Sequence, residues 1–274
     1  MRTTWRSKAA IYVVLTLFAL TFLAPLAYIL INSFKPANEI FRVPQALLPD
    51  RATIENYGAI FEGGFGGFFT TTLFITVAGV LIVAVLSSLA GYGFARFRFP
   101  GSNVLLFAII ATLTIPLVIF LVPMFIMENS VGLINTKLGL LLPNVAVALP
   151  FAILIMRSQF LAIPEEVEES AIVDGAGVFR RWWSIMLPIA RNGVVLVVIM
   201  TAYEIWGEYT MAKALAIDPS AMPLSVGLTL LKGEVWQYGV LAAIIVVAVL
   251  PPVLVFLIFQ RHIVAGVAQG AIKG

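Results

Sequence analysis

Long blocks of apolar residues, separated by short polar segments, dominate the pattern of this chain. The apolar residues fill whole windows of about 20 positions and do not recur at amphipathic spacing, and an α-helix of that length spans a bilayer. The pattern predicts six spans, at about residues 9–33, 68–95, 104–127, 138–160, 193–211 and 239–260. We therefore expect an all-α membrane protein in which residues 1–274 form a single transmembrane domain.

The distribution of lysine and arginine predicts the orientation of these spans. The start of the chain resembles a signal peptide, but its apolar run over 9–33 is too long and favours an uncleaved first span. With the N-terminus inside, eleven basic residues fall on the cytoplasmic side, at positions 2, 6, 8, 96, 98, 157, 180, 181, 191, 261 and 273. Six fall outside, at positions 35, 42, 51, 137, 213 and 232, so both termini are predicted to be cytoplasmic.

Composition supports a membrane environment and removes several kinds of chemistry. Hydrophobic residues make up 61% of the chain and charged residues 11%, which is far from a soluble domain. There is no cysteine and only one histidine, His262, so a thiolate or multi-histidine metal site is not expected. The net charge of +3 fits the orientation of a membrane protein in lipid, and no nucleic-acid partner is expected.

Prolines and two polar segments leave alternatives open. Prolines inside the spans are interpreted as kinks in preference to gating hinges. The outer segments 34–67 and 212–238 are long enough to dock a partner, or they are connecting loops without such a role.

The most informative segment, residues 163–188, lies between the fourth and fifth spans on the predicted cytoplasmic side. Pro164 suits a first helical position, and the four glutamates that follow oppose the positive end of the helix dipole. Ala171 is small enough for another surface to approach, and Asp174-Gly175 forms a turn in which glycine can adopt positive φ. The segment is thus predicted to form a helix that breaks and restarts.

The second helix of this segment is predicted to present an apolar face outside the membrane. Its members, at spacings of three and four, are Phe179, Trp182, Trp183 and Met186, and Pro188 is expected to end the helix. A short amphipathic helix pair of this kind fits a groove on a partner protein. A helix at the lipid headgroups and a solvated acidic loop are the alternatives.

These residues also resemble a known motif. Glu169-Ser170-Ala171, then Gly175, Ile185 and Leu187-Pro188, is similar to the EAA loop of permease subunits of binding-protein-dependent ABC importers. The surroundings resemble the second permease of the maltose-transporter type, and the similarity continues through segments 32–36, 55–57, 92–101 and 259–274. Ser170 departs from the usual alanine, and Gly207 stands where relatives tend to have asparagine.

The resemblance implies that the segment around Glu169 is a coupling helix that fits a cytoplasmic ATPase. The implied coupling residues are Glu169, Ser170, Ala171, Asp174, Gly175, Ala176, Phe179, Leu187 and Pro188. It also implies three kinds of partner: a homologous second permease, a dimer of ATPase subunits, and an extracytoplasmic sugar-binding protein. The C-terminal tail, with Gln260, Arg261, Lys273 and Gly274, is implied to contact the ATPases.

No cofactor is expected on this chain itself. It lacks a Gly-x-x-x-x-Gly-Lys-Ser/Thr loop for phosphates, so ATP and Mg²⁺ are expected on the partner ATPase. The chain is predicted not to be an enzyme.

Carboxylates in the fifth span suggest a substrate pathway. Glu204 and Glu208 are four residues apart and are predicted to share one helix face, near Tyr203, Trp206 and Tyr209. The cluster could bind sugar hydroxyls and stack on a sugar ring. The alternative is that aromatic residues mark the membrane interface and the glutamates lie at the water boundary.

Two other classes of protein are less favoured. A proton-coupled secondary transporter would use Glu204 or Glu208, but the spans show no repeated halves. An intramembrane enzyme would need a nucleophile or metal motif, and the sequence contains neither Gly-x-Ser-x-Gly nor His-Glu-x-x-His.

Overall fold

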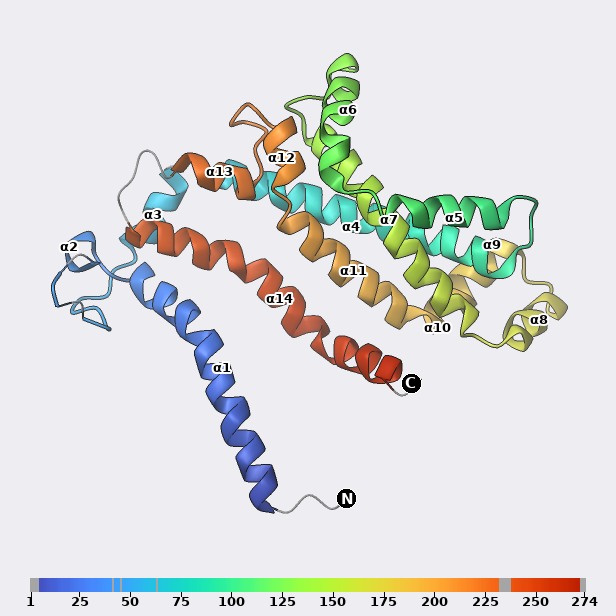
Figure 1. Cartoon of the computed structure of the whole chain (residues 1–274), viewed down its shortest axis with the longest axis horizontal. Helices are drawn as coiled ribbons and strands as arrows, with labels where there is room; N and C mark the ends of the chain where they lie inside the picture. The colour runs from blue at the N-terminus through green and yellow to red at the C-terminus, as the bar shows by residue number, and fades with distance from the viewer. Residues whose placement is uncertain (1–4, 41, 45, 63, 232–237, 272–274) are drawn as a thin grey trace. The chain divides into compact units, whose positions relative to one another are not determined.

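The computed structural model describes residues 5–40, 42–44, 46–62, 64–231 and 238–271, and within them all regular structure is helical (Figure 1). The long helices are α1 (Trp5–Ser33), α4 (Phe65–Arg96), α7 (Lys137–Leu161) and α14 (Tyr238–Ala271). The intermediate helices are α5 (Ser102–Thr112), α6 (Leu117–Ser130) and α11 (Arg191–Trp206). The short ones are α2 (Ala37–Ile40), α3 (Glu55–Glu62), α8 (Glu165–Val173), α9 (Val178–Arg181), α10 (Leu187–Ile189), α12 (Thr210–Leu215) and α13 (Leu224–Leu231).

Four helices are long and apolar enough to cross a membrane, namely residues Lys8–Ser33, Phe65–Arg96, Lys137–Leu161 and Tyr238–Gln260. They coincide within three residues with four of the predicted spans. Two bent pairs, Ser102–Thr112 with Leu117–Ser130 and Val178–Ile189 with Arg191–Trp206, raise the number to six if each pair is one span. The all-helical membrane fold is confirmed, with four to six candidate spans.

The predicted third span is broken, because α5 and α6 meet at an angle of 100°. Pro116 stands at the start of α6 with φ −59° and ψ 132°, and the residue before a proline is disfavoured in the helical conformation. The hydroxyl of Thr114 donates to the Ala111 carbonyl at 2.8 Å, so that part of the freed backbone is satisfied locally. This proline ends a helix, whereas Pro123 lies inside α6.

The chain divides into two compact units, residues 1–66 with 229–250 and residues 67–228 with 251–274. In the second unit, glycines bring three helices into close contact. A Cβ at Gly91 of α4 would lie 2.7 Å from the Met156 Cβ of α7, and one at Gly193 of α11 would lie 2.4 Å from the Gln159 Cγ of α7. Small residues allow such close approach between helices in a membrane.

The first unit contains α1 and most of the outer segment 34–67. The Lys35 side chain is buried and its ammonium donates to the Ala46 carbonyl at 2.7 Å. The Asn56 amide donates to the carbonyls of Ser33 and Lys35, both at 2.9 Å, which fixes the chain at the end of α1. In α1 itself, none of the spanning window is buried within the described chain, so its apolar surface is left for lipid or another protein.

Two expectations about the whole chain stay predictions. One is that residues 1–274 act as a single transmembrane domain, and the other is that both termini face the cytoplasm.

Candidate functional site

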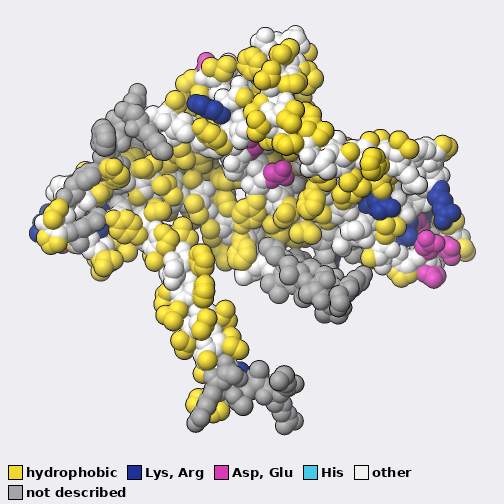
Figure 2. Space-filling model, viewed as in Figure 1, with side chains coloured by type: hydrophobic (Ala, Val, Ile, Leu, Met, Phe, Trp, Pro, Cys, Tyr) yellow, Lys and Arg dark blue, Asp and Glu magenta, His cyan; other side chains and the backbone are white. Residues whose placement is uncertain are grey.

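Helix α8 and its following turn form the first half of the predicted coupling segment. Pro164 precedes the helix as its N-cap, one position earlier than expected, and Glu165, Glu166 and Glu168 occupy the first turn. Segments α8, α9 and α10 lie together at the end of the second unit away from α12 (Figure 1). Charged side chains gather at this end on the face drawn in Figure 2.

The turn after α8 is a Schellman motif closed by Gly175. The Ala176 N–H donates to the Ala171 carbonyl and the Gly175 N–H donates to the Ile172 carbonyl, both at 2.9 Å. Gly175 has φ +75°, which is the left-handed conformation that glycine adopts without steric cost. The predicted turn at Asp174-Gly175 is therefore present, and a helix breaks and restarts there.

The surface of α8 sorts the predicted coupling residues into two groups. Glu169, Ser170 and Asp174 are exposed, whereas Ala171 and Ala176 are buried. The buried alanines are the positions that commonly make a hydrophobic contact across a Schellman turn. Ala171 is thus packed within this chain, and is not open to a partner as the sequence suggested.

The second arm runs through α9, a π-helical turn over Trp182–Met186, and α10. Trp182 and Met186 are buried, while Phe179 is 69% and Trp183 56% exposed. The four residues therefore do not form one exposed face, although the Trp182 ring contacts the rings of Phe179 and Trp183, with centroids 5.2 and 5.5 Å apart. Trp182 and Met186 face the protein, and Phe179 and Trp183 face out.

The end of this arm also differs from the sequence prediction. Pro188 lies inside α10 and does not end the helical segment, which turns by 79° into α11 after Ile189. Leu187 is half-buried and Pro188 is exposed.

A buried glutamate connects this segment to the helix bundle. Glu168 accepts a hydrogen bond from the hydroxyl of Tyr92, and its Oε1 lies 3.2 Å from Arg181 Nε. Its Oε2 pairs with Arg96 Nε at 3.2 Å. All three charged side chains are buried: Arg96 is 6% exposed, Glu168 10% and Arg181 12%.

The sequence alone does not bring this group together. Glu168 is one of four glutamates with the same expected role at the start of a helix, and Arg96 and Arg181 are distant from it in sequence. A usable signal is that Glu168 lies three residues before Ala171 and so shares its face of α8.

The predicted pathway cluster is arranged differently from the expectation. Helix α11 ends at Trp206, so Glu204 and Glu208 do not share a helix face. Glu208 instead caps α12, because its Oε1 accepts from the Met211 N–H at 2.7 Å and its Oε2 from the Ala212 N–H at 2.9 Å. Glu204 is exposed near the end of α11.

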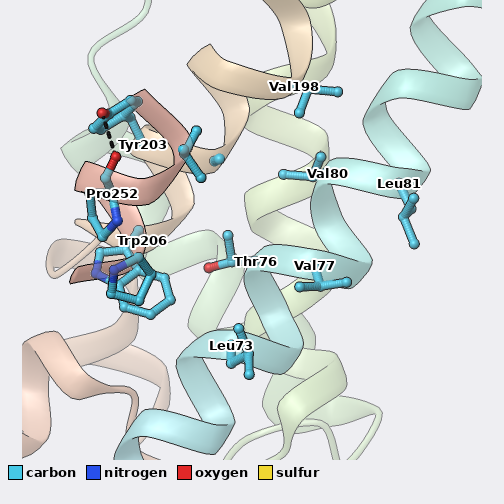
Figure 3. Close-up of a pocket in the computed structure, with 12 residues that line it drawn as sticks. Leu73, Thr76, Val77, Val80, Leu81, Val198, Tyr203, Trp206 and Pro252 are labelled. Atoms are coloured by element: carbon cyan, nitrogen blue, oxygen red, sulfur yellow. Dashed lines mark hydrogen bonds between the residues drawn. The ribbon is translucent and has the colours of Figure 1, made fainter. Parts of the chain in front are cut away.

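Two of the predicted pathway aromatics line a cavity of about 220 Å³ between α4, α11 and α14 (Figure 3). Tyr203 donates its hydroxyl proton to the Pro252 carbonyl at 2.8 Å, and Trp206 packs edge to face on Phe69 with ring centroids 5.8 Å apart. Thr76 places a buried hydroxyl at this cavity, without a hydrogen-bond partner among the described residues. Tyr209 is exposed and precedes α12, outside the cavity lining.

The predicted tail contacts are only partly described. Gln260 is exposed on α14, and its amide donates to the Leu257 carbonyl at 3.1 Å. Arg261 lies in the same helix, whereas Lys273 and Gly274 are outside the described residues. Among the described residues no group of three or more histidines, cysteines or carboxylates is arranged to hold a metal ion.

The helical fold and its four to six candidate spans define a multi-pass membrane protein. Residues 84–269 match the family of binding-protein-dependent transport system inner membrane components, and the chain belongs to this family. It is accordingly a multi-pass inner-membrane protein, the non-ATPase subunit of an ABC importer. Membership implies a second permease, an ATPase and a binding protein as partners.

Named relatives cover nearly the whole chain. It is 35% identical over 272 residues to the diacetylchitobiose uptake system permease protein NgcG of Streptomyces coelicolor, covering 98% of this chain and 90% of the relative. It is 32% identical over 257 residues to the trehalose transport system permease protein SugB of Mycobacterium tuberculosis, covering 92% and 93%.

A solved structure has the same fold. A chain of a bacterial ABC transporter involved in the import of the acidic polysaccharide alginate superimposes with a TM-score of 0.82 at 25% identity, covering 95% of this chain and 99% of that chain. The closer similarity to the maltose-transporter type that the sequence suggested stays a prediction.

Proposed function

We propose that this chain forms half of the translocation pathway of an ATP-driven importer for a sugar or related polyol. The observation that carries the proposal is the exposed apolar surface of the helix–turn–helix segment 163–188. Val173 is 87% exposed beside the turn, and Phe179 and Trp183 are exposed on the second arm. Such side chains outside the apolar spans need a groove on another protein.

The partner that fits this segment is a cytoplasmic ATPase subunit. The contact surface at α8 and its turn consists of Glu169, Ser170, Asp174 and Gly175. The second arm adds Phe179, Leu187 and Pro188. ATP and Mg²⁺ are bound by a dimer of these ATPases, and this chain binds no cofactor. Closure of the dimer moves the segment, and Gln260, Arg261, Lys273 and Gly274 of the tail make a second contact on the cytoplasmic side.

The remaining partners are a second, homologous permease, which completes the pore, and an extracytoplasmic sugar-binding protein, which delivers substrate. The class of substrate is supported by the relatives, whose names specify diacetylchitobiose uptake and trehalose transport. We assign to the pathway two side chains that line the cavity, Tyr203 and Trp206, and three that lie outside its lining, Glu204, Glu208 and Tyr209.

The test is purification of the complete importer through a tag on this chain, in mild detergent, followed by reconstitution with its binding protein. We expect a second permease and two ATPase copies, with hydrolysis stimulated by a sugar such as diacetylchitobiose or trehalose. Uptake by this chain alone, driven by an ion gradient and independent of ATP, would instead identify a secondary transporter.

A further inference from the structure

The Glu168 carboxylate is the point at which both arms of the coupling segment meet the membrane helices. Glu168 belongs to α8, Arg181 to α9, and Tyr92 and Arg96 to the last turns of α4. We propose that Glu168 is a positioning residue that transmits movement of the coupling segment to α4 and α7. The inference rests on the proposed function, because it assigns a residue to the coupling that function requires.

Arg96 extends the connection to a third element. Its Nη2 donates to the carbonyls of Phe160 at 2.9 Å and Ile163 at 2.6 Å, which lie at and just beyond the end of α7. One guanidinium therefore holds the end of α4, the end of α7 and the carboxylate of α8. A lysine could not replace it, since an ammonium lacks the planar fork that reaches several acceptors at once.

Arg181 ties the second arm to the same point. Its Nη1 donates to the Ala176 carbonyl at 3.2 Å, directly after the Schellman turn, while its Nε contacts Glu168. The turn and both of its flanking helices are consequently linked through side chains as well as through the backbone. A displacement of the turn moves Glu168 and Arg181 together.

The contacts around Glu168 are suited to transmitting force because they are directional and shielded from water. The other buried contacts of the second arm are apolar, through Trp182 and Met186, and apolar contacts do not define a single orientation. The hydrogen bonds that Tyr92 and Arg181 donate to Glu168 are charge-assisted and specific in geometry. Water cannot readily replace them here, since each of the three charged side chains is at most 12% exposed.

The charge of Glu168 is required for this arrangement. Two guanidinium groups share the one carboxylate, and its loss would leave two cations close together in a buried site. Glu168→Gln preserves the size of the side chain and removes the charge. We expect the coupling segment of this variant to keep its ATPase-facing surface but to separate from α4.

The deciding experiment uses the whole importer in proteoliposomes and measures ATP hydrolysed per sugar molecule imported. For Glu168→Gln we expect this ratio to rise by roughly tenfold or more, the size expected for the loss of a charge-assisted hydrogen bond. Glu166→Gln is the matched control, because it makes the same chemical change on the exposed side of the same helix. Its ratio should equal that of the wild type.

A merely structural role for Glu168 would give a different result. Less complex would assemble, hydrolysis and import would fall in proportion, and the ratio would stay at the wild-type value, which would overturn the inference. If Glu168→Gln fails to assemble, Tyr92→Phe decides, since it removes only one hydroxyl from the group. A raised ratio in Tyr92→Phe supports the inference and an unchanged ratio refutes it.

Failure of the proposed function is separable from failure of this inference. A wild-type chain that imports sugar without ATP, or that binds no ATPase, would reject the importer itself. A wild-type importer that couples normally while Glu168→Gln and Tyr92→Phe do so equally well would reject only the role of Glu168.

Discussion

A methyl group added at Gly175 should open the turn of the coupling segment without causing any clash. A Cβ at this position would have nothing within 4 Å, so the substitution is tolerated sterically by the surroundings. The backbone, however, has φ +75°, where an L-residue with a Cβ is strained. Gly175→Ala therefore perturbs the turn through its backbone conformation alone.

The expected size of the effect follows from this conformation. The left-handed conformation costs an alanine about 1–2 kcal/mol more than a glycine, and one to two kcal/mol is a factor of roughly 5–30 in an equilibrium. Gly177 supplies the matched control, because its Cβ position is also open but its φ is −64°. Gly177→Ala should leave the turn closed, because an L-residue adopts this φ without strain.

Amide hydrogen exchange measures this opening directly. The N–H groups of Gly175 and Ala176 donate the two hydrogen bonds of the Schellman turn, so position 175 in the variant and Ala176 should exchange roughly 5–30 times faster after Gly175→Ala. The affinity of the nanodisc-embedded permease for its ATPase should fall by a similar factor, because only the closed turn fits the partner. Unchanged exchange in Gly175→Ala, or an equal acceleration in Gly177→Ala, would refute the argument.

Two further predictions concern packing and capping. Gly91→Ala should destabilise the protein by about 1–3 kcal/mol in a thermal unfolding assay, since the new Cβ would lie 2.8 Å from the Arg157 backbone nitrogen. Gly93→Ala is the control and should not destabilise the protein, because a Cβ there would lie in open space. Equal losses of stability in the two variants would contradict the close packing at Gly91. Glu208→Gln should lower stability by about 1 kcal/mol in the same assay, because one of the two oxygens that cap α12 is lost. Unchanged stability would contradict the capping role.

The spans were predictable because they depend on composition over long windows. Backbone groups in lipid must bond within their own segment, so an apolar run of sufficient length becomes a helix whatever its neighbours. A break inside a span, in contrast, depends on local backbone conformation that composition does not show. The sequence contains Pro116, but a proline inside a span can kink a helix or end it, and the 100° bend between α5 and α6 shows the second outcome.

The prediction that Glu204 and Glu208 share one helix face was wrong for a related reason. Four-residue spacing placed Glu204 and Glu208 on one face only if the helix continued through Gly207, a poor helix former. The structure ends α11 at Trp206 and uses Glu208 to start α12. A carboxylate that satisfies the free N–H groups of a new helix competes with continuation of the old one, and a hydropathy window does not register that competition.

The buried position of Glu168 was not predictable from the helix dipole alone, which does not distinguish the four glutamates of α8. All of them suit the start of a helix, and only the rotation of α8 about its axis decides which one turns inward. The Schellman turn fixes that rotation with Ala171 and Ala176 both buried, and cations from α4 and α9 then contact the one glutamate on the same face. Glu165, Glu166 and Glu169 are left exposed, so one short acidic run supplies both an internal ion pair and solvent-facing carboxylates.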